Sequence, residues 1–102
     1  MALELIEKLN GIVVSDADRL DPVRVIFHDI APGQGYLIVT CYNRAWTTYW
    51  GGMSGKTVRE FVSGCDADYV ARNLTWNIKA TKAEMAYVMR VARVVIDACR
   101  AA

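Results

Sequence analysis

The chain lacks an excess of charge of either sign. It has 102 residues, with 12 lysines and arginines against 11 aspartates and glutamates, so its formal net charge is +1. This balance excludes an acidic DNA mimic and a strongly basic nucleic-acid binder, and it argues against nucleic acid as a partner. The hydrophobic fraction of 54% and the charged fraction of 23% are ordinary globular values, which excludes a disordered tail. A chain of this length is expected to form a single domain, residues 1–102.

Long apolar runs are also missing. No stretch approaches about 18 consecutive apolar residues without a charge, so we expect no membrane span. Residues 1–10 contain Glu4, Glu7 and Lys8 among their apolar positions, which does not fit the uncharged core of a signal peptide. The expected location is therefore the cytoplasm.

The sequence has few of the residues that bind metals. Its three cysteines, Cys41, Cys65 and Cys99, are 24 and 34 positions apart, no CxxC occurs, and there is one histidine. A zinc site needs four ligands at recognisable spacing, so no metal is expected. An odd number of cysteines does not suit a secreted disulfide scaffold. We expect three reduced thiols that serve as small apolar residues, and no cofactor.

Two short motifs resemble catalytic sites without completing them. Gly51–Thr57 ends like the phosphate-binding loop G-x-x-x-x-G-K-[ST], but Trp50 stands where that loop needs its first glycine. His28 precedes Asp29, and neighbours in a strand point to opposite faces, so this pair is not a site by itself. The sequence therefore predicts that the protein is not an enzyme.

Three strands are predicted in the middle of the chain, at Val23–Ile30, Tyr36–Tyr42 and Ala45–Trp50, from their alternation and their β-branched and aromatic residues. Asn43–Arg44 is expected to form the tight turn between the last two. One face of that hairpin is the predicted core, with Leu37, Val39, Cys41, Trp46, Thr48 and Trp50. The other face is amphipathic, with Tyr36, Ile38, Thr40, Tyr42, Thr47 and Tyr49.

The first residues fit two structures. Leu3, Ile6 and Leu9 have the spacing of a helix, while Leu3, Leu5 and Leu9 alternate almost as well as a strand. Both interpretations of residues 3–9 stay open.

Three helices are predicted after the strands. Each begins at a residue that can cap it, namely Thr57 with Glu60, Asp66, and Thr81 with Glu84. They are expected at about residues 57–63, 66–73 and 81–100. Strands followed by helices predict an α+β fold. We expect an antiparallel sheet of three or four strands, with two short helices and one long C-terminal helix packed on one face.

The last helix is apolar over most of its surface. That surface is explained either by burial within the monomer or by pairing with the same helix of a second copy. In the second case, Val91, Val94 and Ala98 are the candidate self-association residues, and a two-fold homodimer would cover them.

Aromatic and basic residues gather around the last predicted strand. Trp46, Tyr49 and Trp50 lie within five residues of each other, and they fit a core, a protein interface or a stacking surface for nucleobases. Aromatic residues near arginine are typical anchors of protein interfaces. The candidate partner-binding residues from this region are Tyr42, Arg44, Tyr49, Lys56 and Arg59.

Several distinctive segments lie between residues 20 and 74. They are Leu20–Val23, Ala31–Gly35, Thr40–Tyr42, Ala45–Met53 and Cys65–Tyr69. Through them the chain resembles small accessory proteins, of unknown function, from tailed bacteriophages and prophages. The resemblance brings no functional residue with it. It implies the cytoplasm of a bacterial host, where small phage proteins often bind host machinery, including defence systems.

The functional hypothesis combines this resemblance with the exclusions above. We expect a non-enzymatic phage accessory protein that binds a host protein and acts against an antiviral defence system. The alternative is a nucleic-acid-binding accessory factor in phage replication or recombination.

Overall fold

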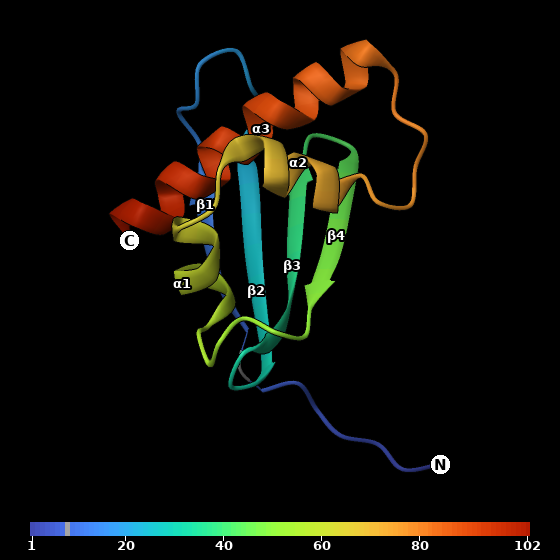
Figure 1. The fold of residues 1–102 in the computed structure, drawn as a ribbon, viewed down its shortest axis with the longest axis vertical. Coiled ribbons are helices and arrows are strands. Elements are labelled where there is room, and N and C mark those ends of the chain that lie inside the picture. Colours follow the sequence, from blue (N-terminus) through green and yellow to red (C-terminus); the bar gives the residue numbers. More distant parts are fainter. Residues whose placement is uncertain (8) are drawn as a thin grey trace.

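A computed structural model of the protein describes residues 1–7 and 9–102. Four antiparallel strands form one sheet in the order β1-β2-β3-β4: β1 (Asn10–Val14), β2 (Val23–Ala31), β3 (Gln34–Cys41) and β4 (Arg44–Trp50). Three helices follow: α1 (Val58–Ser63), α2 (Ala67–Leu74) and α3 (Lys82–Ala101). All three lie on one side of the sheet, and α3 crosses it diagonally (Figure 1). The predicted α+β architecture is confirmed.

The core lies between the sheet and the helices. Val23, Val25 and Phe27 of β2 are buried, and so are all six side chains predicted for the inner face of the β3–β4 hairpin. Trp46 and Trp50 are only 5% and 8% exposed, so both tryptophans belong to the core. Tyr49 points to the other face and is exposed.

The turn between β3 and β4 differs from the prediction by one residue. Cys41 pairs with Arg44, so the turn residues are Tyr42 and Asn43 rather than Asn43 and Arg44. The observed pairing places buried Trp46 opposite buried Val39. Moving the turn by one residue shifts the pairing of β3 with β4 by two residues. Because side chains alternate between the two faces with a period of two, every side chain stays on its predicted face.

The helices begin at the predicted caps. Thr57 and Glu60 form a capping box at α1, with the Glu60 N–H donating to Thr57 Oγ1 at 3.2 Å and the Thr57 N–H donating to Glu60 Oε1 at 3.0 Å. Thr81 and Glu84 form the same arrangement at α3. The Tyr69 N–H donates to Asp66 Oδ1 at 2.8 Å at the start of α2. These local signals place each helix within about one turn of its expected bounds.

The N-terminal segment is neither of the two predicted structures. Residues 1–7 and Leu9 have no regular secondary structure, and β1 begins only at Asn10, which pairs with Phe27. The apolar side chains in these residues are exposed to solvent. A local pattern forms a helix or strand in a protein mainly when tertiary packing supports it. The described part of this chain leaves these side chains largely exposed, with only a shallow contact near His28.

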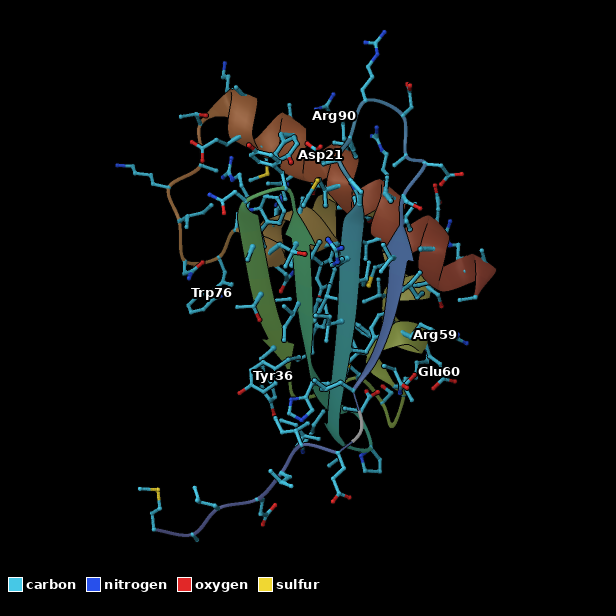
Figure 2. All side chains as sticks on the ribbon, turned by 180° about the vertical axis from the view of Figure 1, so that it is seen from behind. Asp21, Tyr36, Arg59, Glu60, Trp76 and Arg90 are labelled. Carbon is cyan, nitrogen blue, oxygen red and sulfur yellow. The ribbon has the colours of Figure 1, made fainter. Side chains whose placement is uncertain are left out.

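The two edges of the sheet are protected differently. At the β4 edge, the indole N–H of Trp76 donates to the Thr47 carbonyl oxygen at 3.0 Å. Trp76 lies beside β4 outside the sheet (Figure 2). At the β1 edge, no strand of the described residues pairs with the outer side of Asn10–Val14. The β1 edge is therefore the more accessible one.

Candidate partner-binding surfaces

The five predicted partner-binding residues do not form one surface. Tyr42 and Arg44 lie at the β3–β4 turn, at one end of β3. Lys56 lies near the other end, because its carbonyl oxygen accepts the N–H of Gly33 in the β2–β3 turn at 3.2 Å. The eight residues of β3 span about 25 Å at the usual rise per residue. Lys56 is therefore far from the residues of the β3–β4 turn.

Arg44 is engaged by its own chain on the helix side of the sheet. Its Nη2 atom lies 3.3 Å from Glu84 Oε2, and its guanidinium lies 5.4 Å from the Trp46 ring centroid. The hydrogen bond from the Thr81 backbone N–H, with a smaller contribution from Arg44, lowers the pKa of Glu84. Arg44 thus links the β3–β4 turn to the start of α3 through its ion pair with Glu84. Its side chain lies on the opposite face of the sheet from Tyr49.

Tyr49 is the one candidate on the opposite face, and it has aromatic neighbours there. Its ring centroid lies 5.0 Å from that of Tyr36, and the Tyr36 centroid lies 6.0 Å from that of His28. The register explains this row, since His28 pairs with Tyr36 and Tyr36 with Tyr49. The alternation of the sequence predicts Tyr36 on the face of Tyr49, but Tyr36 was not among the candidate partner-binding residues, and His28 was considered only as a catalytic residue. The strand alternation was the signal that could have found both.

The row belongs to a sheet surface that we call the open face. Among the described residues, no helix covers this side of the sheet (Figure 2). Its outward side chains on β2, β3 and β4 include Arg24, Ile26, His28, Tyr36, Ile38, Thr40, Thr47 and Tyr49. Ile26 pairs with Ile38 at the centre. Arg24 is the one formally charged group in this set, which contains no carboxylate.

The glycine-rich segment before α1 has a structural role in this conformation. The Met53 N–H donates to the Gly33 carbonyl oxygen at 2.9 Å, and the Lys56 N–H donates to the Met53 carbonyl oxygen at 3.1 Å. The Val58 N–H donates to Asp29 Oδ1 at 2.8 Å. These donors, which a phosphate-binding loop would point at its ligand, are bonded to the chain itself. The segment packs against the β2–β3 turn and caps α1.

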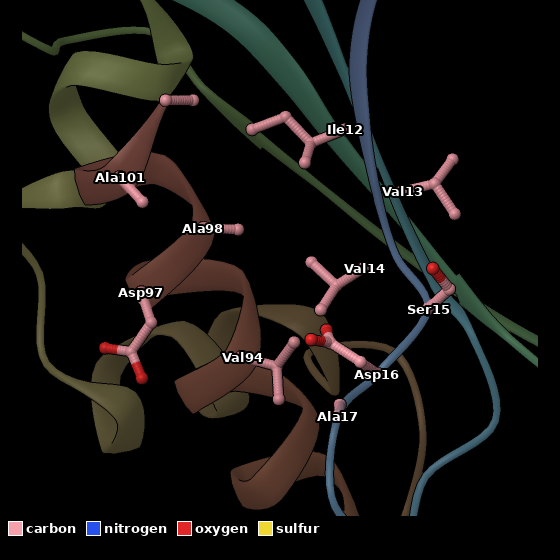
Figure 3. A pocket seen from close by; sticks show the side chains of 11 residues that line it. Ile12, Val13, Val14, Ser15, Asp16, Ala17, Val94, Asp97, Ala98 and Ala101 are labelled. Carbon is pink, nitrogen blue, oxygen red and sulfur yellow. The ribbon is translucent and has the colours of Figure 1, made fainter.

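A second surface feature is a groove between β1 and α3 (Figure 3). Its volume is about 670 Å³. Ile12 and Val14 line it from β1, and Val94, Ala98 and Ala101 line it from α3, with Asp16 and Asp97 also among the lining residues. In Figure 3, Val13 points away from the helix. The groove is an apolar channel beside the free edge of the sheet.

The structure corrects the predicted set of self-association residues on the last helix. Val91 is 0% exposed and lies in the core of its own chain, because α3 packs on α1, α2 and the sheet. It is not accessible to a second copy. Val94 and Ala98 are half-buried and line the groove. Of the three candidate self-association residues, these two remain exposed to a partner.

The described residues include no candidate metal cluster and no helix that could span a membrane. Residues 1–7 and 9–102 contain no cluster of three or more histidine, cysteine, aspartate or glutamate side chains that could hold a metal ion. None of the helices described for this chain is long and apolar enough to cross a bilayer.

Comparison with known proteins identifies the family. The profile of a family described as a phage family matches residues 4–101. This chain belongs to that phage family. The phage match includes most of the N-terminal segment and the whole of α3, which the resemblance over residues 20–74 had not covered. Comparison with curated proteins and with solved structures found no match.

Proposed function

We propose that this phage protein is a non-enzymatic accessory factor that binds a host protein in the bacterial cytoplasm through the open face of its sheet. The observation that carries the proposal is the open face itself. It combines an aromatic row with aliphatic side chains, and no helix of the described chain covers it. Antiparallel sheets often have one solvated face, but that face is then normally polar. Exposed apolar and aromatic surface with few charges is typical of protein interfaces.

The chemistry of the open face favours a protein over a nucleic acid. Its centre is aliphatic, with Ile26 opposite Ile38. Tight nucleic-acid binding requires several cations that neutralise phosphates, and Arg24 is the one permanent cation in the set defined above. The rings of His28, Tyr36 and Tyr49 also pack on one another, which leaves less ring surface for bases.

Inhibition of an antiviral defence system is the specific role that we propose for this interaction. It rests on the phage family and on the protein-type chemistry of the face. A phage gains from blocking a host protein without any chemical step, and an aromatic sheet face can do this by covering a functional surface of its target. Such a role requires no cofactor or metal ion.

The test is affinity capture from host lysate with three versions of the protein. Tyr36→Ser/Tyr49→Ser removes both tyrosines of the aromatic row. Tyr42→Ser is the control, because Tyr42 is also an exposed tyrosine but lies at the turn, outside the row. We expect mass spectrometry to find a host protein with wild type and Tyr42→Ser, and at least a tenfold loss with the double variant. Equal recovery with all three versions would contradict binding through the open face. Circular dichroism checks that the variants are folded.

A nucleic-acid-binding factor in phage replication or recombination is the second candidate. The observation in its favour is the same aromatic row, since exposed rings on a sheet can stack bases. The test is fluorescence anisotropy with a single-stranded oligonucleotide across salt concentrations. We expect only weak, non-specific binding at physiological salt. Submicromolar binding that is lost in Tyr36→Ser/Tyr49→Ser, or on mutation of Arg44, Lys56 and Arg59, would put nucleic acid first.

A further inference from the structure

The groove beside β1 lies along the unpaired edge of the sheet. The outer edge of β1 has no paired strand among the described residues, and α3 extends beyond this edge at its C-terminal end (Figure 1). Beneath the overhang, Val94 and Ala98 face the groove together with Ile12 and Val14 (Figure 3). A strand added to β1 would bond to its free backbone groups. Its inward side chains would then fill the groove under α3.

The chain contains a segment suited to this position, which we call the N-terminal arm (residues 1–9). Leu3 and Leu5 are 81% and 87% exposed. With a strand period of two, they share one face with Glu7 and Leu9, and Glu4 lies between them on the other face. Nine extended residues reach about 30 Å, which exceeds the length of the five-residue β1 edge. The arm is therefore long enough and apolar enough to act as an added strand.

The arm of one chain runs away from its own groove. Glu4, Leu5 and Ile6 line a shallow surface pocket with His28 and Ile30, at the end of β2. The groove lies on the outer side of β1, on the opposite side from β2. Figure 2 shows the arm leaving the sheet below β2 and extending under β4. To reach its own groove, the chain would have to reverse sharply just before Asn10.

We infer that two copies of this protein exchange their N-terminal arms, with each arm adding a strand to the free β1 edge of the other copy. Leu3 and Leu5 of one copy occupy the groove formed by β1 and α3 of its partner. Each copy supplies one arm and accepts one, so the arrangement is a closed two-fold dimer. The interaction covers two apolar features that a single chain leaves exposed outside the open face, namely the arm and the groove.

The interface lies at the small end of the range for stable dimers. Eleven residues line the groove, with Val13 pointing away from the helix, and the arm has nine residues. About twenty residues on each copy is the lower end of what standard protein interfaces use. The β1 edge and the groove are separate from the open face, and the arm meets that face only beside His28. Loss of the dimer is therefore distinguishable from loss of host-protein binding through Tyr36 and Tyr49.

The first test measures oligomeric state by size-exclusion chromatography with light scattering. We expect wild type to be a dimer of about twice the 11.4 kDa chain mass. Leu3→Ser/Leu5→Ser should be a folded monomer, because both side chains lie outside the monomer core. The matched control is Ala2→Ser/Glu4→Gln, which changes the other face of the arm and should remain a dimer. A monomeric wild type at 1 mM, or a dimer that survives Leu3→Ser/Leu5→Ser, would overturn the inference.

The second test distinguishes exchange from an arm that folds back on its own chain. In a Cys65→Ser background, one protein carries Leu5→Cys and a second carries Ala98→Cys. After mixing, a short bismaleimide should link the two proteins into a covalent heterodimer, at least tenfold above the background protein alone. No heterodimer in the mixture, or linkage only within single chains of a Leu5→Cys/Ala98→Cys variant, would refute arm exchange.

Discussion

Tyr42 has a backbone conformation that bulky residues rarely adopt. Its φ angle is +55°, and it lies in the two-residue turn between β3 and β4. For an L-residue with a side chain this region costs roughly 1–2 kcal/mol, and asparagine tolerates it better than most residues. The Tyr42 side chain is exposed, so the core gains nothing from it.

Replacing Tyr42 by asparagine is therefore expected to stabilise the fold. We expect Tyr42→Asn to raise the free energy of unfolding by about 0.5–1 kcal/mol, measured by urea denaturation. Tyr49→Asn is the control, because Tyr49 has ordinary strand geometry and contacts Tyr36, and it should lower stability. An unchanged or reduced stability in Tyr42→Asn would show that the turn is not strained.

The cysteines differ in accessibility, and this difference predicts their reactivity. Cys41 and Cys99 are buried, while Cys65 is half-buried, and all three are free. Burial raises the pKa of Cys99 to about 11. Burial, and to a smaller extent the charge of Asp66, raise the pKa of Cys65 above its usual value. A raised pKa means less thiolate, which is the reactive form, at neutral pH.

We expect at most one slow adduct when the native protein is alkylated at pH 8, and that adduct should be on Cys65. In denaturant without reductant, three adducts should form. Mass spectrometry counts them, and Cys65→Ser should give no native adduct. Rapid labelling of all three thiols in the native protein, or fewer than three adducts after denaturation, would contradict this picture.

At the level of elements, the signals that are local in sequence were reliable. The capping residues Thr57, Asp66 and Thr81 predicted the helices, because a cap is formed by atoms within a few residues. Strand alternation predicted which side chains of β3 and β4 are buried. The position of the β3–β4 turn was not predictable, because moving the turn by one residue leaves every side chain of β3 and β4 on the same face. The state of residues 1–7 was not predictable either, because it depends on packing that a local pattern does not show.

The two capping boxes also predict a pH dependence. Hydrogen bonds from Thr57 and Thr81 lower the pKa values of Glu60 and Glu84 below their usual 4.5. A carboxyl group with a lowered folded-state pKa contributes stability above its unfolded pKa, and this contribution is lost as the pH falls through the folded value. The free energy of unfolding of wild type should therefore fall as the pH drops below about 4.5.

The variant Glu60→Gln/Glu84→Gln should show a smaller fall over the same range, because glutamine keeps a side-chain acceptor but does not titrate. Thermal unfolding followed between pH 3 and pH 7 measures the effect. Thr57→Ala and Thr81→Ala should each cost about 1 kcal/mol at pH 7. Parallel pH profiles for wild type and the glutamine variant would show that these carboxylates contribute nothing.

For the whole molecule, the sequence could identify surface residues but could not group them. Arg44 and Tyr49 are five positions apart in one strand, and the alternation of the strand sends them to opposite faces. Lys56 and Arg59 follow at the far end of the sheet. The open face became visible only when the register brought His28 and Tyr36 beside Tyr49.

The positions of Val91 and Val94 allow a paired test of the whole-molecule arrangement. Val91→Glu should prevent folding, because it places an unpaired charge in the core. Val94→Glu should fold, because Val94 lines an open groove, and it should abolish dimer formation. Circular dichroism and light scattering measure the two properties. A folded Val91→Glu would contradict the packing of α3, and a dimeric Val94→Glu would contradict the use of the groove.

The single hydrogen bond from Trp76 to β4 has a consequence for how large an assembly can become. Strands with two open edges can add further copies without limit and grow into fibrils. Here the indole N–H occupies a carbonyl group of the β4 edge, so the β1 edge is the one left for growth. A sheet that extends on one side only stops when that side is filled. By bonding one carbonyl group of the β4 edge, Trp76 disfavours growth of the sheet on that side.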